Sequence, residues 1–157
     1  MAIRILLTGA AGHIGQAFRE YTGDRYKLRL GVHHRSKLED PGAHEVLEFD
    51  IADLAACRKA CQDMEMVIHL AANVHPTSDF YADLLESNIK GTYNIFRAAA
   101  DQGCRRVIFT SSTQAVDGYP LDVQVHPDSP VKPTNMYGVT KCFGEAVAHY
   151  FSYAEGL

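Results

Sequence analysis

Three glycines, each three residues after the last, follow directly on a short apolar segment near the start of the chain. Residues 3–8 have the composition of a buried β-strand, and residues 8–15 read Thr-Gly-Ala-Ala-Gly-His-Ile-Gly. Gly9 permits a tight turn, Gly12 leaves the backbone open to close approach, and Gly15 lets a following helix pack against the strand. A strand that enters a helix through such a turn restricts the chain to an α/β fold.

The rest of the chain alternates short apolar segments with amphipathic ones. We predict strands at residues 3–8, 27–32, 45–49, 66–70 and 106–111. The first and second helices are expected to begin near His13 and Ala52, and a long helix should cover residues 84–100. A last helix should begin at Thr134, a suitable N-cap. This alternation is typical of βαβ units that build a doubly wound parallel sheet.

The composition is that of an ordinary globular domain. With 157 residues, 46% of them apolar, and a net charge of -4, we expect one domain over residues 1–157. We expect no nucleic-acid or membrane partner, because there is no basic excess and no segment of membrane-spanning length. The start of the chain lacks the features of a signal peptide, and the four cysteines lack disulfide or metal-site spacing. A cytoplasmic location without a bound metal is therefore expected.

The glycine turn predicts a site for a dinucleotide. The N-terminus of the helix that follows it offers free N–H groups and the positive end of the helix dipole to a pyrophosphate. The cofactor contacts expected here are Gly9, Ala11, Gly12, His13, Ile14 and Gly15. Such a turn can also merely connect a strand to a helix, but the βαβ units around it favour the cofactor site.

The end of the second predicted strand bears on which dinucleotide is bound. Folds that bind NAD usually place an acidic residue there, which accepts a hydrogen bond from the ribose 2′-hydroxyl. Residues 30–36 read Leu-Gly-Val-His-His-Arg-Ser and contain no acid, whereas Arg35 with Ser36 can hold a 2′-phosphate. We therefore expect NADP in preference to NAD. The alternative is an ordinary solvated loop, with the cofactor held by other contacts.

Tyr137 and Lys141 stand four residues apart in the last predicted helix, so their side chains share one face. An ammonium beside a phenol stabilises the phenolate, which allows the phenol to act as a base near neutral pH. Taken alone, such a pair is more often simply solvated. The hydroxyl-rich residues 110–113 favour catalysis, because they end the fifth predicted strand and ligands of doubly wound sheets bind at that edge.

Several segments together resemble the extended short-chain dehydrogenase/reductases, also described as NAD-dependent epimerase/dehydratases. The resemblance covers the whole chain. Besides the glycine turn, it includes Asp50-Ile51, His69-Leu70-Ala71-Ala72, Asn88-Ile89-Lys90-Gly91-Thr92, Ser111-Ser112 and Tyr137-Gly138-Val139-Thr140-Lys141. It implies a Rossmann fold that binds NAD or NADP and an enzyme that oxidises or epimerises a sugar hydroxyl.

The resemblance also implies roles for particular residues. Tyr137 is implied as the acid–base group, and Lys141 as the cation that assists it and holds the nicotinamide ribose. Ser112 is implied as the hydroxyl that orients the carbonyl, with Thr113 as an alternative, and Asn88 as part of a proton relay. The cofactor contacts implied in this way are Asp50, Ile51, Leu70, Ala71, Ala72, Asn88, Tyr137 and Lys141.

Structural alternatives exist for several of these residues. Asp50 can cap the second helix, Asn88 can be a core amide bonded to nearby backbone, and His69 is expected to be buried and structural. Cys57 and Cys61 lie four residues apart and are better explained as core thiols than as metal ligands.

Within the family, residues 111–120 and 137–145 look most like the uronate dehydrogenases, which oxidise the C1 hydroxyl of a hexuronic acid with NAD. The chain departs from that group at Thr113-Gln114, where the uronate enzymes have Asn-His, and at Val32, where they have an acid. Sugar-nucleotide epimerases therefore stay as an alternative. The expected substrate contacts are His75, Ser112, Thr113, Gln114 and Tyr137, beside a long loop at residues 117–133.

Members of the family continue past the last predicted helix into a C-terminal substrate-binding region. Because the chain stops at Leu157, we expect that region to be missing and the chain to be a fragment of a longer one. A non-catalytic dinucleotide-binding or interaction module is therefore a second hypothesis. The helices at residues 84–100 and 137–151 resemble the pair that forms the dimer interface in this family, which implies a homodimer.

Overall fold

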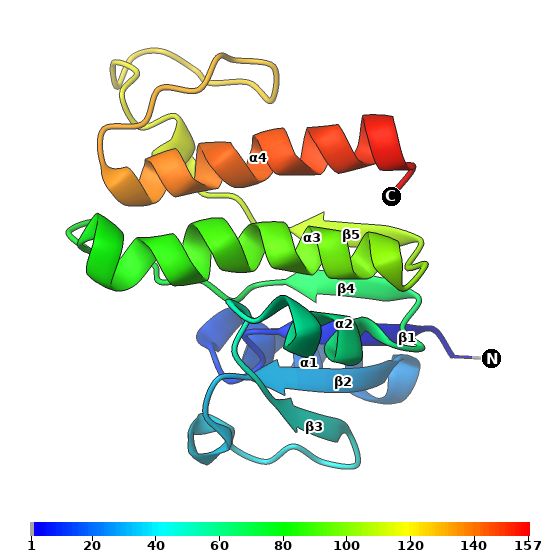
Figure 1. The fold of residues 1–157 in the computed structure, drawn as a ribbon. Coiled ribbons are helices and arrows are strands. Elements are labelled where there is room, and N and C mark those ends of the chain that lie inside the picture. Colours follow the sequence, from blue (N-terminus) through cyan, green and yellow to red (C-terminus); the bar gives the residue numbers. More distant parts are fainter. Residues whose placement is uncertain (1) are drawn as a thin grey trace.

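Five parallel strands form one sheet in the computed structural model, which describes residues 2–157 (Figure 1). The strands are β1 (Arg4–Thr8), β2 (Lys27–Val32), β3 (Glu45–Glu48), β4 (Met66–His69) and β5 (Arg106–Phe109). Their order is β3-β2-β1-β4-β5. This is the predicted doubly wound arrangement, with strand bounds within two residues of those predicted. The order changes direction at β1, where such sheets bind ligands.

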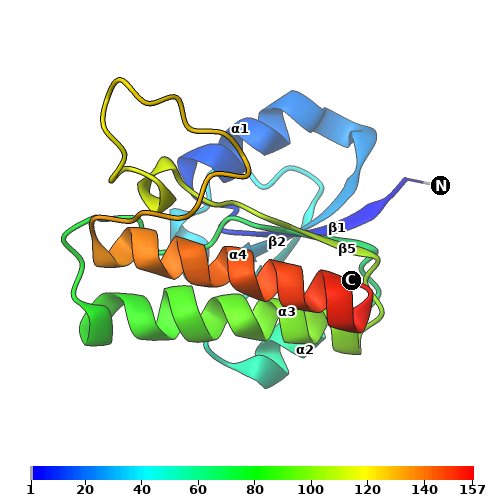
Figure 2. The same ribbon diagram turned by 90° about the horizontal axis from the view of Figure 1, so that it is seen from above.

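Helices cover both faces of the sheet (Figure 2). The helix α1 (His13–Thr22) lies on one face, and α2 (Leu54–Cys61), α3 (Gly91–Asp101) and α4 (Met136–Glu155) lie on the other. A π-helix, η3 (Phe80–Lys90), leads directly into α3, and the two form one long rod beside α4 (Figure 1). Short 3-10 turns are η1 (Gly23–Arg25), η2 (Arg35–Lys37) and η4 (Thr113–Ala115).

The long rod differs from its prediction in two ways. It begins at Phe80 rather than at residue 84, and its first half is a π-helix, in which the N–H of Gly91 donates to the carbonyl of Glu86. The apolar spacing of the sequence predicts a helix but does not distinguish these two forms. A Cβ on Gly91 would lie 2.6 Å from the side chain of Ile51, so glycine lets α3 approach the segment after β3.

The helix α2 begins at Leu54, later than the predicted start near Ala52. Its N-cap is Asp53, whose carboxylate accepts from two N–H groups of the first turn. Asp50 does not cap this helix. Its carboxylate accepts instead from the N–H of Ala52, at 2.8 Å.

The helix α4 begins at Met136, and its N-cap is Asn135 rather than Thr134. The Asn135 side chain accepts from the N–H of Gly138 at 2.9 Å. The Thr134 hydroxyl is used elsewhere, because it donates to the Asp117 carboxylate at 2.8 Å. This contact ties the start of α4 to the loop before it.

The sheet buries side chains on both faces. Ile5 and Leu7 pack in a core on the α1 side, whereas Leu6 packs on the side of α2 and α3, as the alternation of a strand requires. Three buried thiols also belong to the second core: Cys57, Cys61 and Cys104. Within residues 2–157 no three metal-binding side chains gather, and no helix is long and apolar enough to cross a membrane.

Candidate functional site

The three glycines of the turn meet different requirements. Gly9 has a φ of 69°, and a Cβ on it would lie 2.7 Å from the backbone nitrogen of Ala71. A Cβ on Gly15 would lie 2.6 Å from the carbonyl oxygen of Gly9. Gly12 is exposed, and a Cβ there would meet only the same oxygen, at 3.3 Å. Gly9 and Gly15 therefore shape the turn, whereas Gly12 keeps its outer side open.

The N-terminus of α1 has no side-chain cap. Gly12 is the N-cap residue, and no acid lies in the first turn. The N–H of Gln16 donates to the carbonyl of Gly12 at 2.9 Å, and the N–H groups of the turn before it have no acceptor inside the helix. The positive end of the helix dipole lies at the same place. A phosphate group would supply both the acceptors and the negative charge that this end favours.

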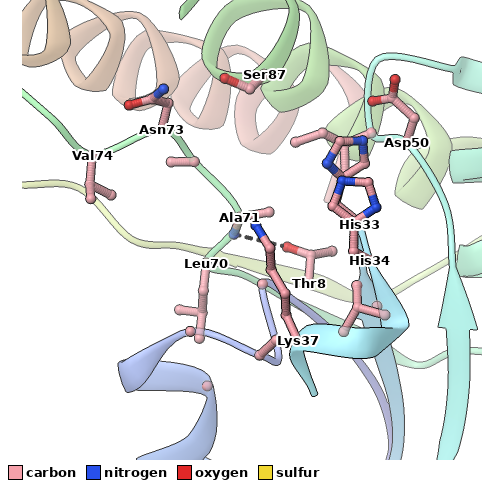
Figure 3. A pocket seen from close by; sticks show the side chains of 18 of the residues that line it. Thr8, His33, His34, Lys37, Asp50, Leu70, Ala71, Asn73, Val74 and Ser87 are labelled. Carbon is pink, nitrogen blue, oxygen red and sulfur yellow. Dashed lines mark hydrogen bonds between the residues drawn. The ribbon is translucent and has the colours of Figure 1, made fainter. Parts of the chain in front are cut away.

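A cavity of about 810 Å³ opens beside this turn (Figure 3). It lies at the carboxyl ends of β1, β2 and β4, with η3 on one side. Its volume is within the range of small-molecule and cofactor sites, about 300 to 1,000 Å³. All the contacts predicted in the glycine turn line this cavity, from Gly9 to Gly15 without Ala10. Four further segments of the chain line the same cavity. They include five of the predicted cofactor contacts: Asp50, Ile51, Leu70, Ala71 and Ala72.

Arg35 does not line the cavity, although it was the cation predicted to do so. Its backbone N–H donates to the Glu48 carboxylate at 2.8 Å, at the start of η2. The residues of this segment that line the cavity are instead His33, His34 and Lys37. The segment predicted from the sequence thus reaches the cavity through other side chains than Arg35, and the 3-10 turn that orients them has no clear signal in these residues.

One wall of the cavity was not assigned from the sequence. It comes from η3 and from the segment after β4, and its members are Asn73, Val74, Ala82, Asp83, Glu86 and Ser87. The members in η3 recur at intervals of one to four residues, as on one side of a helix. The predicted helix began only at residue 84, so this signal was incomplete.

The floor of the cavity is held by a buried chain of hydrogen bonds. The Thr8 hydroxyl lies 2.8 Å from Nδ1 of His69, and it accepts from the N–H of Ala71 at 3.3 Å. On its other side, Nε2 of His69 lies 3.4 Å from the Thr92 hydroxyl. Burial, with the nearby Lys141 charge, lowers the pKa of His69 to about 3, so the imidazole is neutral. His69 is thus buried and structural, as predicted.

Tyr137 and Lys141 lie together on the buried side of α4. The Lys141 Nζ lies 5.6 Å from the centroid of the Tyr137 ring and donates to the carbonyl of Thr110 at 2.9 Å. Burial lowers the pKa of Lys141 from 10.5 to about 8. Neither side chain is part of the cavity wall. The pair stands beside the segment that leaves the carboxyl end of β5.

The hydroxyl-rich segment after β5 packs against the first turn of α4. A Cβ on Gly138 would overlap the carbonyl oxygen of Gln114, so glycine allows η4 to approach the helix. The Ser112 hydroxyl accepts from the N–H of Gln114 at 3.2 Å, and the Gln114 side chain accepts from the amide of Asn135. Thr113 is exposed. The structure therefore brings these residues near Tyr137 but not to the cavity wall.

Asn88 is a buried amide with all its groups engaged. Its NH2 donates to the carbonyl of Asn73 at 2.8 Å and to the hydroxyl of Thr140 at 3.0 Å, while its oxygen accepts from the N–H of Asn73 at 2.8 Å. Asn88 thus joins three parts of the chain: the segment after β4, η3 and α4. This agrees with the structural alternative given for Asn88, a core amide bonded to nearby backbone. His75 is exposed, bonds to the Thr77 hydroxyl at 2.9 Å, and does not line the cavity.

The sheet, the glycine turn and the cavity define a Rossmann-like fold with an open site over its switch point. The chain belongs to the NAD dependent epimerase/dehydratase family, which it matches over residues 5–157. Among its relatives is a uronate dehydrogenase of Pseudomonas putida, 34% identical over 150 residues, which are 94% of this chain and 55% of the relative. Another is the L-arabinose 1-dehydrogenase (NAD(P)(+)) of Haloferax volcanii, 31% identical over 98% of this chain and 63% of the relative.

Solved structures show the same likeness. A uronate dehydrogenase from Agrobacterium tumefaciens in complex with NAD superimposes with a TM-score of 0.88 and 32% identity. The match covers 99% of this chain and 58% of the other. The chain therefore spans between 55% and 63% of the length of these relatives.

Proposed function

We propose that this chain is the cofactor-binding and acid–base part of an oxidoreductase that acts on a hydroxyl of a sugar or sugar derivative. The observation that carries the proposal is the pairing of the Lys141 ammonium with the Tyr137 ring, 5.6 Å apart, in a chain that also holds an open cavity over the glycine turn. The names of the relatives, which are sugar dehydrogenases, support the substrate class. Residues 1–157 would act as one dinucleotide-binding domain.

The cavity fits NAD or NADP by its own features. The uncapped N-terminus of α1 would bind the phosphates, and the open side of Gly12 leaves room for them. Asp50 and Ile51 would lie at the adenine end, and Ala71 with Ala72 along the rest of the cofactor. When bound, the nicotinamide ring accepts or donates the hydride. We also propose that NADP is preferred to NAD, because no acid directly follows β2.

The proton is handled by side chains of this chain. In the oxidising direction Tyr137 takes the proton of the substrate hydroxyl, and in the reducing direction it returns it. Lys141 stabilises the phenolate by its charge, and it is well oriented because Thr110 accepts from its Nζ. The Ser112 hydroxyl donates to the substrate oxygen, with Thr113 as the alternative donor. Asn88 would take part in a proton relay by holding the backbone of Asn73, to which its amide bonds.

Gln114, His75 and the loop at residues 117–133 would bind the sugar, together with any chain outside the present sequence. A hexuronic acid is the first candidate, because uronate dehydrogenases are among the relatives. A sugar-nucleotide epimerase or dehydratase is the second, because the family includes these reactions. Epimerisation uses the same proton and hydride transfers at a substrate carbon.

A third candidate is a dinucleotide-binding module without turnover, because the chain spans only 55% of a relative such as the uronate dehydrogenase of Pseudomonas putida. For all three candidates we propose a homodimer through η3–α3 and α4. The exposed side chains of these helices include Tyr81, Tyr93, Tyr150 and Tyr153. We also propose a cytoplasmic location, where the four free thiols would stay reduced.

The test is cofactor reduction by glucuronate and galacturonate, measured at 340 nm with NADP and with NAD, for the wild type and for Tyr137→Phe. We expect the variant to lose a factor of about 100 or more in kcat while its affinity for cofactor stays within about twofold. Tyr153→Phe, an exposed tyrosine of the same helix, is the matched control. An unchanged kcat in Tyr137→Phe would overturn the acid–base role, and tight cofactor binding without turnover in the wild type would favour the module.

A further inference from the structure

We infer that Lys37, which lines the same cavity as His33 and His34, binds the 2′-phosphate of NADP and makes this chain select NADP over NAD. The inference rests on the proposed function only in requiring that a dinucleotide occupies the cavity. It replaces Arg35, the cation that the sequence indicates, with another residue of the same turn.

The placement of these side chains carries the first step. His33, His34 and Lys37 all line the cavity where it meets the ends of β2 and β3 (Figure 3). The two imidazole rings lie 4.2 Å apart between centroids, and the Lys37 side chain extends toward the interior of the cavity from η2. These residues follow β2 directly, at the place where doubly wound folds read the adenosine ribose.

The geometry of η2 explains why Lys37 and not Arg35 faces the cavity. In a 3-10 turn, side chains three residues apart lie above one another, whereas side chains two apart point in different directions. His34 is the N-cap of η2, with extended backbone, and it lines the cavity together with Lys37. Arg35 and Lys37 are two apart, and only Lys37 does so. The backbone N–H of Arg35 is fixed at the start of the turn by Glu48, at 2.8 Å.

The charges at this end of the cavity favour an anion. Lys37 takes part in none of the ion pairs found within residues 2–157, so its ammonium has no carboxylate oxygen within 4.0 Å there. Glu48 does not line the cavity, whereas three other acids do: Asp50, which accepts from the N–H of Ala52 at 2.8 Å, and Asp83 and Glu86, which belong to η3. Folds that prefer NAD usually have a carboxylate at the end of the second strand. At that place this chain has the buried Val32 and then His33.

A 2′-phosphate beside the end of β2 would therefore find the Lys37 ammonium in the cavity wall, and no carboxylate at the position that NAD-binding folds use. Charge-assisted hydrogen bonds to a phosphate are about twice as strong as neutral ones. A 2′-hydroxyl in the same place would leave the ammonium without a strong acceptor. We expect NADPH to bind at least about tenfold more tightly than NADH, from one such contact.

The test uses binding, so that it does not depend on turnover. Dissociation constants of NADPH and NADH are measured by the fluorescence of the reduced nicotinamide, and those of adenosine 2′,5′-bisphosphate and 5′-AMP by calorimetry. Lys37→Ala should weaken NADPH and adenosine 2′,5′-bisphosphate about tenfold and leave NADH and 5′-AMP within about twofold. Arg35→Ala, which removes the same charge from the same turn, is the matched control and should change none of the four by more than about twofold.

The outcomes separate this inference from the proposed function. Equal affinity of the wild type for NADPH and NADH, with no effect of Lys37→Ala, would overturn the inference and leave a dinucleotide site in place. A loss of NADPH affinity in Arg35→Ala but not in Lys37→Ala would overturn it in favour of Arg35. Failure of all four ligands to bind would overturn both the inference and the proposed function.

Discussion

Lys141 lies under the Tyr137 ring with its Nζ 5.6 Å from the ring centroid, yet its ammonium is almost entirely removed from water, with 5% of the residue exposed. A charge so placed lowers the stability of the fold, because the ammonium has lost most of its hydration. Burial lowers the pKa of Lys141 from 10.5 to about 8, which means that the amine keeps its proton at pH 7 but its charged form is less stable in the fold than in water. Such a residue is expected at a functional site.

Lys141→Met should therefore stabilise the fold and abolish activity. The shift in pKa corresponds to about 3 kcal/mol at pH 7, of which about 1 kcal/mol is offset by the lost hydrogen bond to Thr110, so we expect a gain of about 2 kcal/mol. The gain should shrink as the pH rises above 8, because the lysine then loses its proton in the folded state. Urea unfolding at pH 7 and pH 9 measures both effects. Lys37→Met, at an exposed lysine, should change stability by about 0.5 kcal/mol or less, and a destabilised Lys141→Met would contradict this account.

His69 should make the stability fall in mild acid. Its pKa is lowered from 6.5 to about 3 by burial, so between these values the unfolded chain binds a proton that the folded chain does not. The stability contributed by the neutral imidazole is complete above pH 6.5, and it is lost below that pH at up to about 1.4 kcal/mol per unit. Unfolding free energies at pH 7, 6 and 5 should show this slope in the wild type and a smaller one in His69→Asn. Parallel pH curves for the two proteins would refute the explanation.

Gly12 and Gly15 should separate cofactor binding from folding. Gly12→Ala adds a methyl group on the open side of the turn, where only the Gly9 oxygen is near, at 3.3 Å. We expect a change in stability of about 1 kcal/mol or less, with a loss of NADPH affinity of about tenfold or more. Gly15→Ala forces a Cβ to 2.6 Å from the same oxygen and should cost about 1 to 3 kcal/mol of stability. Melting temperatures that fall by the same amount in Gly12→Ala and Gly15→Ala would contradict the different roles given to the two glycines.

Gly144 should be required by the ring beneath it. A Cβ at this position would overlap the ring of Phe109, which also lies 5.0 Å from the Lys141 Nζ. Gly144→Ala should destabilise the chain by about 1 to 3 kcal/mol, although alanine is the better helix former. In a Phe109→Leu background the same change should cost at least about 0.5 kcal/mol less, because the ring is gone. A cost that is equal in both backgrounds, measured by urea unfolding, would show that the clash is not the cause.

The features predicted well from the sequence are those with local causes. The strands are short apolar runs, and the glycine turn is defined by the spacing of Gly9, Gly12 and Gly15. The family and its likeness to uronate dehydrogenases were also identified from motifs and are confirmed by the comparisons. The roles of the individual site residues stay predictions, although the structure pairs Tyr137 with Lys141 and gathers most of the cofactor set in one cavity.

The features missed from the sequence depend on contacts between distant segments. Thr134 looks like an N-cap, but Asp117, which precedes it by 17 residues, takes its hydroxyl and leaves the cap to Asn135. Arg35 was predicted to line the cofactor site, but in the structure Lys37 of the same turn lines the cavity and Arg35 does not. The π-helical form of η3 has no marker in the spacing of apolar residues, so its contribution to the cavity was not foreseen.

The bonds of Asn88 have a mechanical consequence. The helix η3 forms one wall of the cavity, and Asn88 fastens it both to the segment after β4 and, through Thr140, to α4. If η3 moves outward and widens the cavity, either the hydrogen bonds of the Asn88 amide must break or α4 must move with η3. If the Asn88 bonds stay intact, an outward movement of this wall would also displace the phenol of Tyr137, and the phenol would regain its position only when the wall returns.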